Sequence, residues 1–184
     1  MITLIIVDCQ NDFISGSMSI EGAKTAVNEI KNYINKYRKD IEKIIFTVDW
    51  HPYNHMSFKK HGGDKQNHCI QFTPGACIES KLLKLVQSFN INYEVSKKGE
   101  IEEVEELGAF NDIEFVTDEL GQYYYFDSLV TANANTDFVI CGINQNSCIQ
   151  TTIQNLVNNN ICPKIFKKGI ANYNFNNCYK LTEI

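Results

Sequence analysis

Four side chains capable of chemistry follow short apolar runs of the sequence: Asp8, Asp49, Lys98 and Cys148. A carboxylate beside a thiol can take its proton, and the resulting thiolate attacks carbonyl carbons. Cys148 is expected in the first turn of a helix, where the partial positive charge favours thiolate over thiol, and a nearby Lys98 acts in the same direction. Taken singly, each residue is more often a turn acid, a solvated lysine or a core cysteine. Together they predict a cysteine nucleophile.

The four histidines lie within residues 51–68, directly after Asp49: His51, His55, His61 and His68. An Asp-x-His pair followed by further histidines suits a borderline divalent ion such as zinc, which takes imidazole and carboxylate ligands. Asp49 and His51 are the first ligands expected, followed by His68 and His55, and His61 comes last. The alternative is that these are surface histidines of a loop.

The elements that must position these groups alternate along the chain. Apolar runs predict strands at 4–7, 44–48, 93–96, 138–141 and 164–166. Apolar stripes at helical spacing predict helices at 23–38, 78–89 and 149–157. This alternation predicts a mostly parallel sheet covered by helices on both faces, with the ligand site beyond the carboxyl ends of its strands. Within 100–135, the acidic stretch 100–108 is expected to be a solvated helix face, and 123–126 an edge strand or a pocket wall.

Composition narrows the class of protein. The chain has 184 residues and a formal net charge of −5, so we expect one domain over residues 1–184 and no basic face for nucleic acid or anionic membrane. No apolar run approaches the ~18 residues of a membrane span, and the first residues do not read as a signal peptide. The seven cysteines are scattered singly, which predicts free thiols in a reducing cytoplasm.

Several segments resemble a known family. IIVDCQNDF, TVDWHPYNHMSF, HCIQFTPGA, the pair Lys98-Gly99 and GINQNSC occur in this order. They are similar to motifs of the isochorismatase-like cysteine hydrolases, and most similar to the nicotinamidase branch. The resemblance implies an α/β fold, a three-layer α/β/α sandwich around a mostly parallel central sheet. It also implies a catalytic triad, Asp8, Lys98 and Cys148, and a divalent metal ion, zinc first, held by Asp49, His51, His68 and His55.

The resemblance further implies how a substrate would be held. The backbone N–H groups of Asn144 and Cys148 would form an oxyanion hole, with a cis peptide bond between Ile143 and Asn144. Phe13 would pack against the substrate ring, and Ile143 and Asn144 would also contact the substrate. The chain departs from the nicotinamidase pattern at 64–67, where a Trp-Pro pair is usual. A tyrosine-serine-phenylalanine motif is replaced by 108–110 or 124–126.

The activity implied is hydrolysis of nicotinamide to nicotinate and ammonia through a cysteine thioester, in pyridine nucleotide salvage and NAD metabolism. The partner implied is a small-molecule substrate, with a homo-oligomer expected by analogy. Three alternatives stay open. The cysteine could act on another small amide, a ureide or isochorismate; a zinc ion could activate water instead; or the chain could bind a nicotinamide-like ligand without turning it over.

Overall fold

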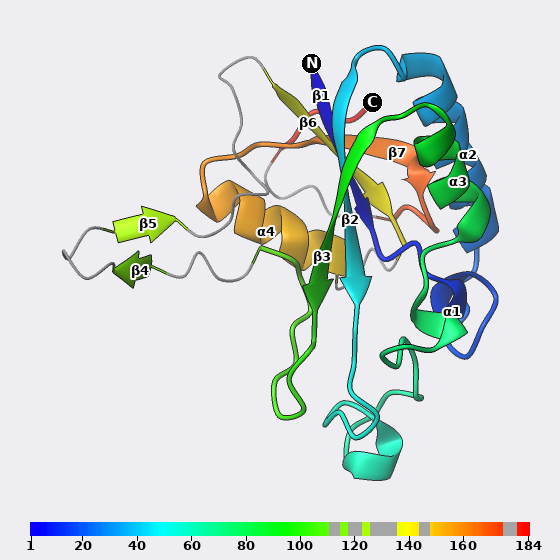
Figure 1. The fold of residues 1–184 in the computed structure, drawn as a ribbon, viewed down its shortest axis with the longest axis vertical. Coiled ribbons are helices and arrows are strands. Elements are labelled where there is room, and N and C mark those ends of the chain that lie inside the picture. The colour runs from blue at the N-terminus through cyan, green and yellow to red at the C-terminus, as the bar shows by residue number, and fades with distance from the viewer. Residues whose placement is uncertain (111–114, 118–122, 126–135, 144–147, 175–179) are drawn as a thin grey trace.

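The computed structural model describes residues 1–184 apart from 111–114, 118–122, 126–135, 144–147 and 175–179 (Figure 1). Among the described residues, no helix is long and apolar enough to cross a membrane.

A parallel sheet forms the middle layer. Its strands run in the order β3-β2-β1-β6-β7, and every pair is parallel. The strands are β1 (Ile2–Val7), β2 (Ile41–Asp49), β3 (Asn92–Lys98), β6 (Asp137–Gly142) and β7 (Lys164–Ile170). Central β1 is almost wholly apolar, as a strand covered on both faces requires. The predicted parallel sheet is confirmed, and each predicted run lies within one of these strands.

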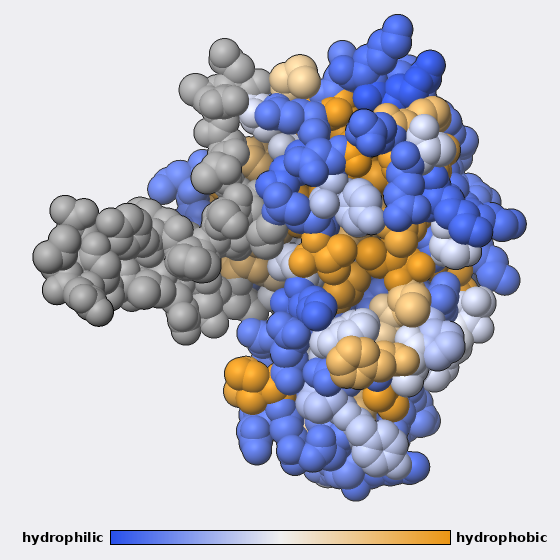
Figure 2. Space-filling model, in the orientation of Figure 1, coloured by the Kyte–Doolittle hydropathy of each residue, from blue (hydrophilic) through white to orange (hydrophobic). Residues whose placement is uncertain are grey.

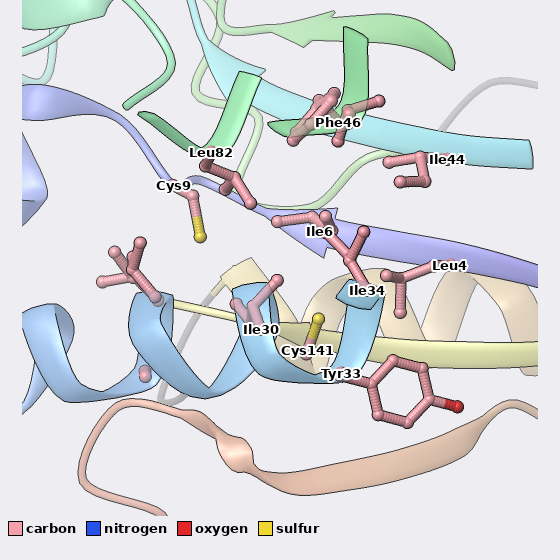
Figure 3. Packing of buried hydrophobic residues seen from close by; sticks show 14 of the residues in the cluster. Leu4, Ile6, Cys9, Ile30, Tyr33, Ile34, Ile44, Phe46, Leu82 and Cys141 are labelled. Carbon is pink, nitrogen blue, oxygen red and sulfur yellow. The ribbon is translucent and has the colours of Figure 1, made fainter. Parts of the chain in front are cut away.

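Helices cover both faces of this sheet (Figure 1). On one face lie α2 (Ala23–Tyr37) and α3 (Ser80–Ser88), and on the other lies α4 (Gln150–Asn158). The side chains of β1 alternate between the two layers: Leu4 and Ile6 join the cluster under α2 and α3, while Ile5 and Val7 join the one under α4. Figure 3 shows the first cluster, in which Ile30 and Ile34 of α2 face β1. The three-layer α/β/α sandwich is therefore confirmed.

Shorter elements lie outside these layers. They are α1 (Asn11–Ile14), two single turns, η1 (Lys59–His61) and η2 (Pro74–Ala76), and an antiparallel pair, β4 (Phe115–Thr117) with β5 (Tyr123–Tyr125). The expected strand at 123–126 thus pairs with β4 in a two-stranded sheet of its own, and Phe126 lies outside the described residues. On the face shown in Figure 2, hydrophilic residues cover most of the described surface, and apolar residues gather near its middle.

The acidic stretch differs from its prediction. Residues 100–107 form no helix and instead run as a loop against the histidine-bearing segment. Two backbone carbonyls of this loop bond to that segment. Glu102 C=O accepts from the Met56 N–H at 2.9 Å, and Val104 C=O lies 3.0 Å from His55 Nε2. The expected helix is therefore wrong, because these carbonyls bond to another part of the chain, whereas the expected exposure to solvent is confirmed at 100–104 and 107.

Candidate active site and metal centre

The reactive groups gather at the carboxyl edge of the sheet. Asp8 directly follows β1, Asp49 ends β2 and Lys98 ends β3. The strand register pairs Asp49 with Lys98, so parallel pairing alone brings two of the groups together. Cys148 precedes α4, in the connection that leaves β6. Figure 1 shows the loop after β2 extending beyond the arrowheads of β2 and β3.

Lys98 lies at the centre of this group. Its Nζ is 3.1 Å from Asp8 Oδ2 and 3.5 Å from Cys148 Sγ, and it forms an ion pair with Asp49 Oδ1. All four side chains are buried, with residue exposures of 0% for Asp8, 5% for Asp49, 2% for Lys98 and 3% for Cys148. A buried lysine between two buried carboxylates is rare unless the charges compensate one another. The structure thus brings the three predicted triad residues into contact and adds Asp49.

Asp8 is held in an unusual backbone conformation. Its φ is 54°, in the left-handed region that residues other than glycine rarely adopt. Thr47 of β2 fixes it twice: Thr47 C=O accepts from the Asp8 N–H at 3.0 Å, and the Thr47 hydroxyl donates to Asp8 Oδ1 at 3.1 Å. These bonds leave Oδ2 directed at Lys98.

Burial sets the protonation states. It raises the pKa of Asp8 to about 6, against the lowering effect of Lys98. Burial also raises the pKa of the Cys148 thiol well above its ordinary value, and the nearby Asp8 adds to this while Lys98 opposes it. The helix start and Lys98 were expected to favour the thiolate, but desolvation outweighs the charge of Lys98 and shifts the pKa in the opposite direction. Burial therefore favours the thiol form of Cys148, next to a carboxyl whose raised pKa lets it gain and lose a proton near neutral pH.

Asp49 and Lys98 keep opposite charges. Burial alone would raise the pKa of Asp49, yet the Lys98 ammonium, with the neighbouring His51 and His68 acting in the same direction, brings that pKa well below its usual value. Burial alone would lower the pKa of Lys98, yet Asp49 and Asp8 raise it well above the usual value. Asp49 is thus a carboxylate and Lys98 an ammonium over the whole physiological range.

Two histidines converge on Asp49. His51 Nε2 and His68 Nε2 each lie 3.6 Å from Asp49 Oδ2, and one ligand atom from each of the three residues lies within 4.8 Å of the others. The other ring nitrogen of each histidine bonds a backbone carbonyl, Gly99 C=O at 3.1 Å from His51 Nδ1 and Gln66 C=O at 2.7 Å from His68 Nδ1. Such bonds fix the tautomer with a bare Nε2.

These three residues fit a divalent metal ion. His51 Nε2 is buried and has no hydrogen-bond partner in the part of the chain that the structure describes. A buried nitrogen without a partner is costly unless it has a ligand to bind. Two imidazoles and a carboxylate are a zinc-type donor set that leaves coordination positions open.

His55 and His61 lie differently. His55 Nδ1 is 2.8 Å from the Ser57 hydroxyl and its Nε2 is 3.0 Å from Val104 C=O, so both nitrogens have partners. Its ring stacks on His51 with centroids 4.2 Å apart. A ligand role for His55 therefore requires its ring to leave these bonds. His61 is exposed.

Two buttressing residues were not expected from the sequence. Gln10 is fully buried and clamps Asp49: its Oε1 accepts from the Asp49 N–H at 2.8 Å, and its Nε2 donates to Asp49 C=O at 2.7 Å and to Ala76 C=O at 2.8 Å. The Phe58 ring packs against His51, His55 and His68 at centroid distances of 5.5–5.8 Å. The available signals were the position of Gln10 two residues after Asp8, and an aromatic residue among the histidines.

The predicted substrate-binding residues divide into two groups. Phe13 is fully buried and its ring lies 5.4 Å from that of His68, and Ile143 is also fully buried. Asn144 lies outside the described residues, and so does the peptide bond expected to be cis before it. Residues 64–67 are exposed or half-buried.

Of the two segments expected in place of the tyrosine motif, 108–110 packs on α4. The Thr152 hydroxyl accepts from the Ala109 N–H at 3.1 Å, and Asn155 Nδ2 donates to Ala109 C=O at 2.8 Å. Ala109 and Phe110 belong to the same buried cluster as Cys148. Segment 108–110 therefore belongs to the same side of the core as Cys148.

Comparisons with known proteins bear on the family and the fold. The isochorismatase domain model matches residues 3–92. A nicotinamidase of Saccharomyces cerevisiae is 30% identical over 139 residues, which cover 61% of this chain and 63% of the relative. The chain thus matches less than two thirds of that relative's length.

Solved structures share the fold. The yeast nicotinamidase bound to the inhibitor nicotinaldehyde superposes with a TM-score of 0.75 at 23% identity, covering 93% of this chain and 88% of that one. The pyrazinamidase of Pyrococcus horikoshii in complex with zinc gives 0.69 at 21% identity, covering 92% and 86%. At these identities the likeness establishes the α/β/α architecture.

Proposed function

We propose that this chain, which belongs to the isochorismatase-like family, is an amidohydrolase that converts nicotinamide to nicotinate and ammonia through a thioester on Cys148. The observation that carries the proposal is the position of Lys98 Nζ, 3.1 Å from Asp8 and 3.5 Å from Cys148 Sγ, beside the Asp49–His51–His68 cluster. The names of the relatives, nicotinamidases and a pyrazinamidase, support a pyridine or pyrazine carboxamide as substrate.

The first half of the reaction uses Asp8 as a base. Asp8 takes the proton of the Cys148 thiol while the sulfur attacks the amide carbon, and Lys98 stabilises the negative charge that builds up beside it. The backbone N–H of Cys148 would donate to the developing oxyanion, a contribution of about 3 kcal/mol. Asp8 then gives its proton to the departing amine, which leaves as ammonia, and a thioester remains on Cys148.

The second half uses the same carboxylate. Asp8 takes a proton from water, the hydroxide attacks the thioester carbon, and the C–S bond breaks. Asp8 returns the proton to the sulfur, so the products are the original thiol and nicotinic acid, which loses its proton to solvent and becomes nicotinate. The pKa of Asp8, raised to about 6 by burial, suits a group that must gain and lose a proton near neutral pH.

Asp49, His51 and His68 would hold a divalent metal ion, which we propose to be zinc. When bound, that ion supplies a Lewis-acid contact for the pyridine nitrogen and so orients the ring. The zinc-containing pyrazinamidase among the solved structures supports this choice of metal. Phe13, whose ring packs against that of His68, would help to shape the ring pocket. We further propose that residues 1–184 act as one domain, in the cytoplasm, in pyridine nucleotide salvage.

An ammonia-release assay tests the proposal. Wild type is assayed with nicotinamide, pyrazinamide, a small ureide and isochorismate, the last by following loss of the enol ether. We expect nicotinamide to be hydrolysed, Cys148→Ala to be inactive, and Cys77→Ala, which removes an exposed thiol, to keep full activity. If only the ureide or only isochorismate is hydrolysed, nicotinamide is not the substrate and the hydrolysed compound takes its place in the proposal. Activity that survives in Cys148→Ala but is lost on chelation would point to metal-activated water.

A further inference from the structure

Glu106, in the acidic loop after β3, bonds to the residue that orients a candidate metal ligand. Its Oε2 accepts from the Gly99 N–H at 2.5 Å. Gly99 C=O in turn accepts from His51 Nδ1 at 3.1 Å. The chain of contacts therefore runs from a carboxylate on the loop to the imidazole whose bare Nε2 faces Asp49.

Gly99 is closely fitted to His51. Its φ is +67°, and a Cβ added at this position would overlap Cε1 and Nδ1 of the His51 ring. The N–H and C=O of Gly99 belong to the two peptide planes that meet at its Cα, so a bond that holds the N–H restrains one of these two planes. A hydrogen bond from an amide to a carboxylate is about twice as strong as one between neutral groups. Glu106 thus restrains Gly99 on its N–H side, while its C=O side bonds His51.

We infer that Glu106 is a positioning residue for the metal centre: acting through Gly99, it holds His51 in the orientation that binds the ion and so sets the affinity of the site for a divalent cation. The inference rests on the metal site of the proposed function. Removing a residue that orients a metal ligand through hydrogen bonds typically changes metal affinity 10–100-fold. The sequence gives Glu106 no special place among its acidic neighbours.

Glu105 provides a matched control. It is adjacent, carries the same charge and forms an ion pair with Lys65 at 3.1 Å, with both side chains about a quarter exposed. Removing it takes the same charge from the same loop without touching Gly99. An effect common to both positions would come from the loop or from general electrostatics, and an effect confined to Glu106 would come from the Gly99 bond.

The experiment measures metal binding directly on the full chain. The protein is stripped with a chelator, and its affinity for Zn²⁺ is measured by competition with a chromophoric chelator. The visible absorption of the Co²⁺ form reports the ligand geometry. We expect Glu106→Ala to weaken Zn²⁺ binding about 10–100-fold and to change the Co²⁺ spectrum. Glu106→Gln keeps an acceptor oxygen and should stay within about 5-fold of wild type, and Glu105→Ala should match wild type in both measurements.

Wild-type affinity in Glu106→Ala, or equal weakening in Glu105→Ala and Glu106→Ala, would overturn the inference. Circular dichroism of the metal-free variants checks folding, and Glu106→Asp, whose side chain is one methylene shorter, replaces Glu106→Ala if the latter does not fold. If wild type binds neither ion, the inference fails together with the metal part of the proposed function. Ammonia release that depends on Cys148 in the same preparation would leave the cysteine part standing.

Discussion

Replacing Lys98 by methionine tests the charge arrangement of the site. Methionine keeps an unbranched apolar chain of similar length but removes the ammonium that contacts Asp8, Asp49 and Cys148. Two buried carboxylates then lose their only cation among the contacts described. Removing one partner from a buried ion pair costs about 3–5 kcal/mol, because the remaining charge stays buried without compensation. We expect the free energy of unfolding to fall by about that amount at pH 7.5.

The cost should shrink in acid. Lys98 lowers the pKa of both Asp8 and Asp49, so without it both carboxyls bind protons at higher pH in the folded variant. Asp8, with a pKa already raised to about 6 in wild type, should be neutral at pH 5 in Lys98→Met, which removes part of the penalty. Wild type, in contrast, loses the stabilisation from Asp49 as the pH falls through the lowered pKa of that group.

Urea denaturation at pH 7.5 and pH 5.0 measures both effects. Lys97→Met is the control, because Lys97 is exposed and its ammonium, among the described residues, contacts only Glu100, in a long ion pair of 3.9 Å, and the Trp50 ring. It should change stability by no more than about 0.5 kcal/mol. A Lys98→Met cost below about 1 kcal/mol, or one that is as large at pH 5.0 as at pH 7.5, would refute the reasoning.

Three further predictions concern single groups. Because Asp8 acts as the base only when ionised, kcat/KM for nicotinamide should fall as the pH drops through about 6, by about tenfold per pH unit below that; a flat profile down to pH 5 would exclude Asp8 as that base. Gln10→Met leaves buried backbone groups of Asp49 without partners, at about 1–3 kcal/mol each, and denaturation should show a loss that exposed Gln87→Met does not. Gly99→Ala should weaken Zn²⁺ binding because the added Cβ would overlap the His51 ring. Gly62→Ala is the control, because Gly62 also has a positive φ but a Cβ there would meet no described atom, so it should leave Zn²⁺ binding unchanged. Equal Zn²⁺ affinities of the two variants would contradict this prediction.

Much of the fold could be predicted because parallel strands buried on both faces appear in the sequence as continuous apolar runs. The continuous apolar residues of β1 and β2 can only be covered by helices on both sides. The carboxyl ends of parallel strands gather at one edge, so the sequence alone predicts that Asp8, Asp49 and Lys98 lie near one another.

The features that could not be predicted from the sequence depend on burial and on the direction of backbone groups. The state of the Cys148 thiol could not be predicted because desolvation, which a sequence does not show, outweighs the nearby lysine. The acidic stretch was interpreted from its charge, yet its backbone carbonyls and Glu106 bond to the histidine loop and to Gly99. His55 matched a ligand by type and position, but the structure gives both its nitrogens other partners.

The most direct test of the central claim is a rapid-quench measurement of the protein's own mass during turnover. Wild type is mixed with nicotinamide and stopped in acid within milliseconds, and intact-protein and peptide mass spectra are recorded. A nicotinoyl group bound through sulfur should appear on the peptide that carries Cys148 and on no other, and Cys148→Ala should neither acquire it nor release ammonia. Ammonia release by wild type with the group on a different residue, or continued release by Cys148→Ala, would contradict the account.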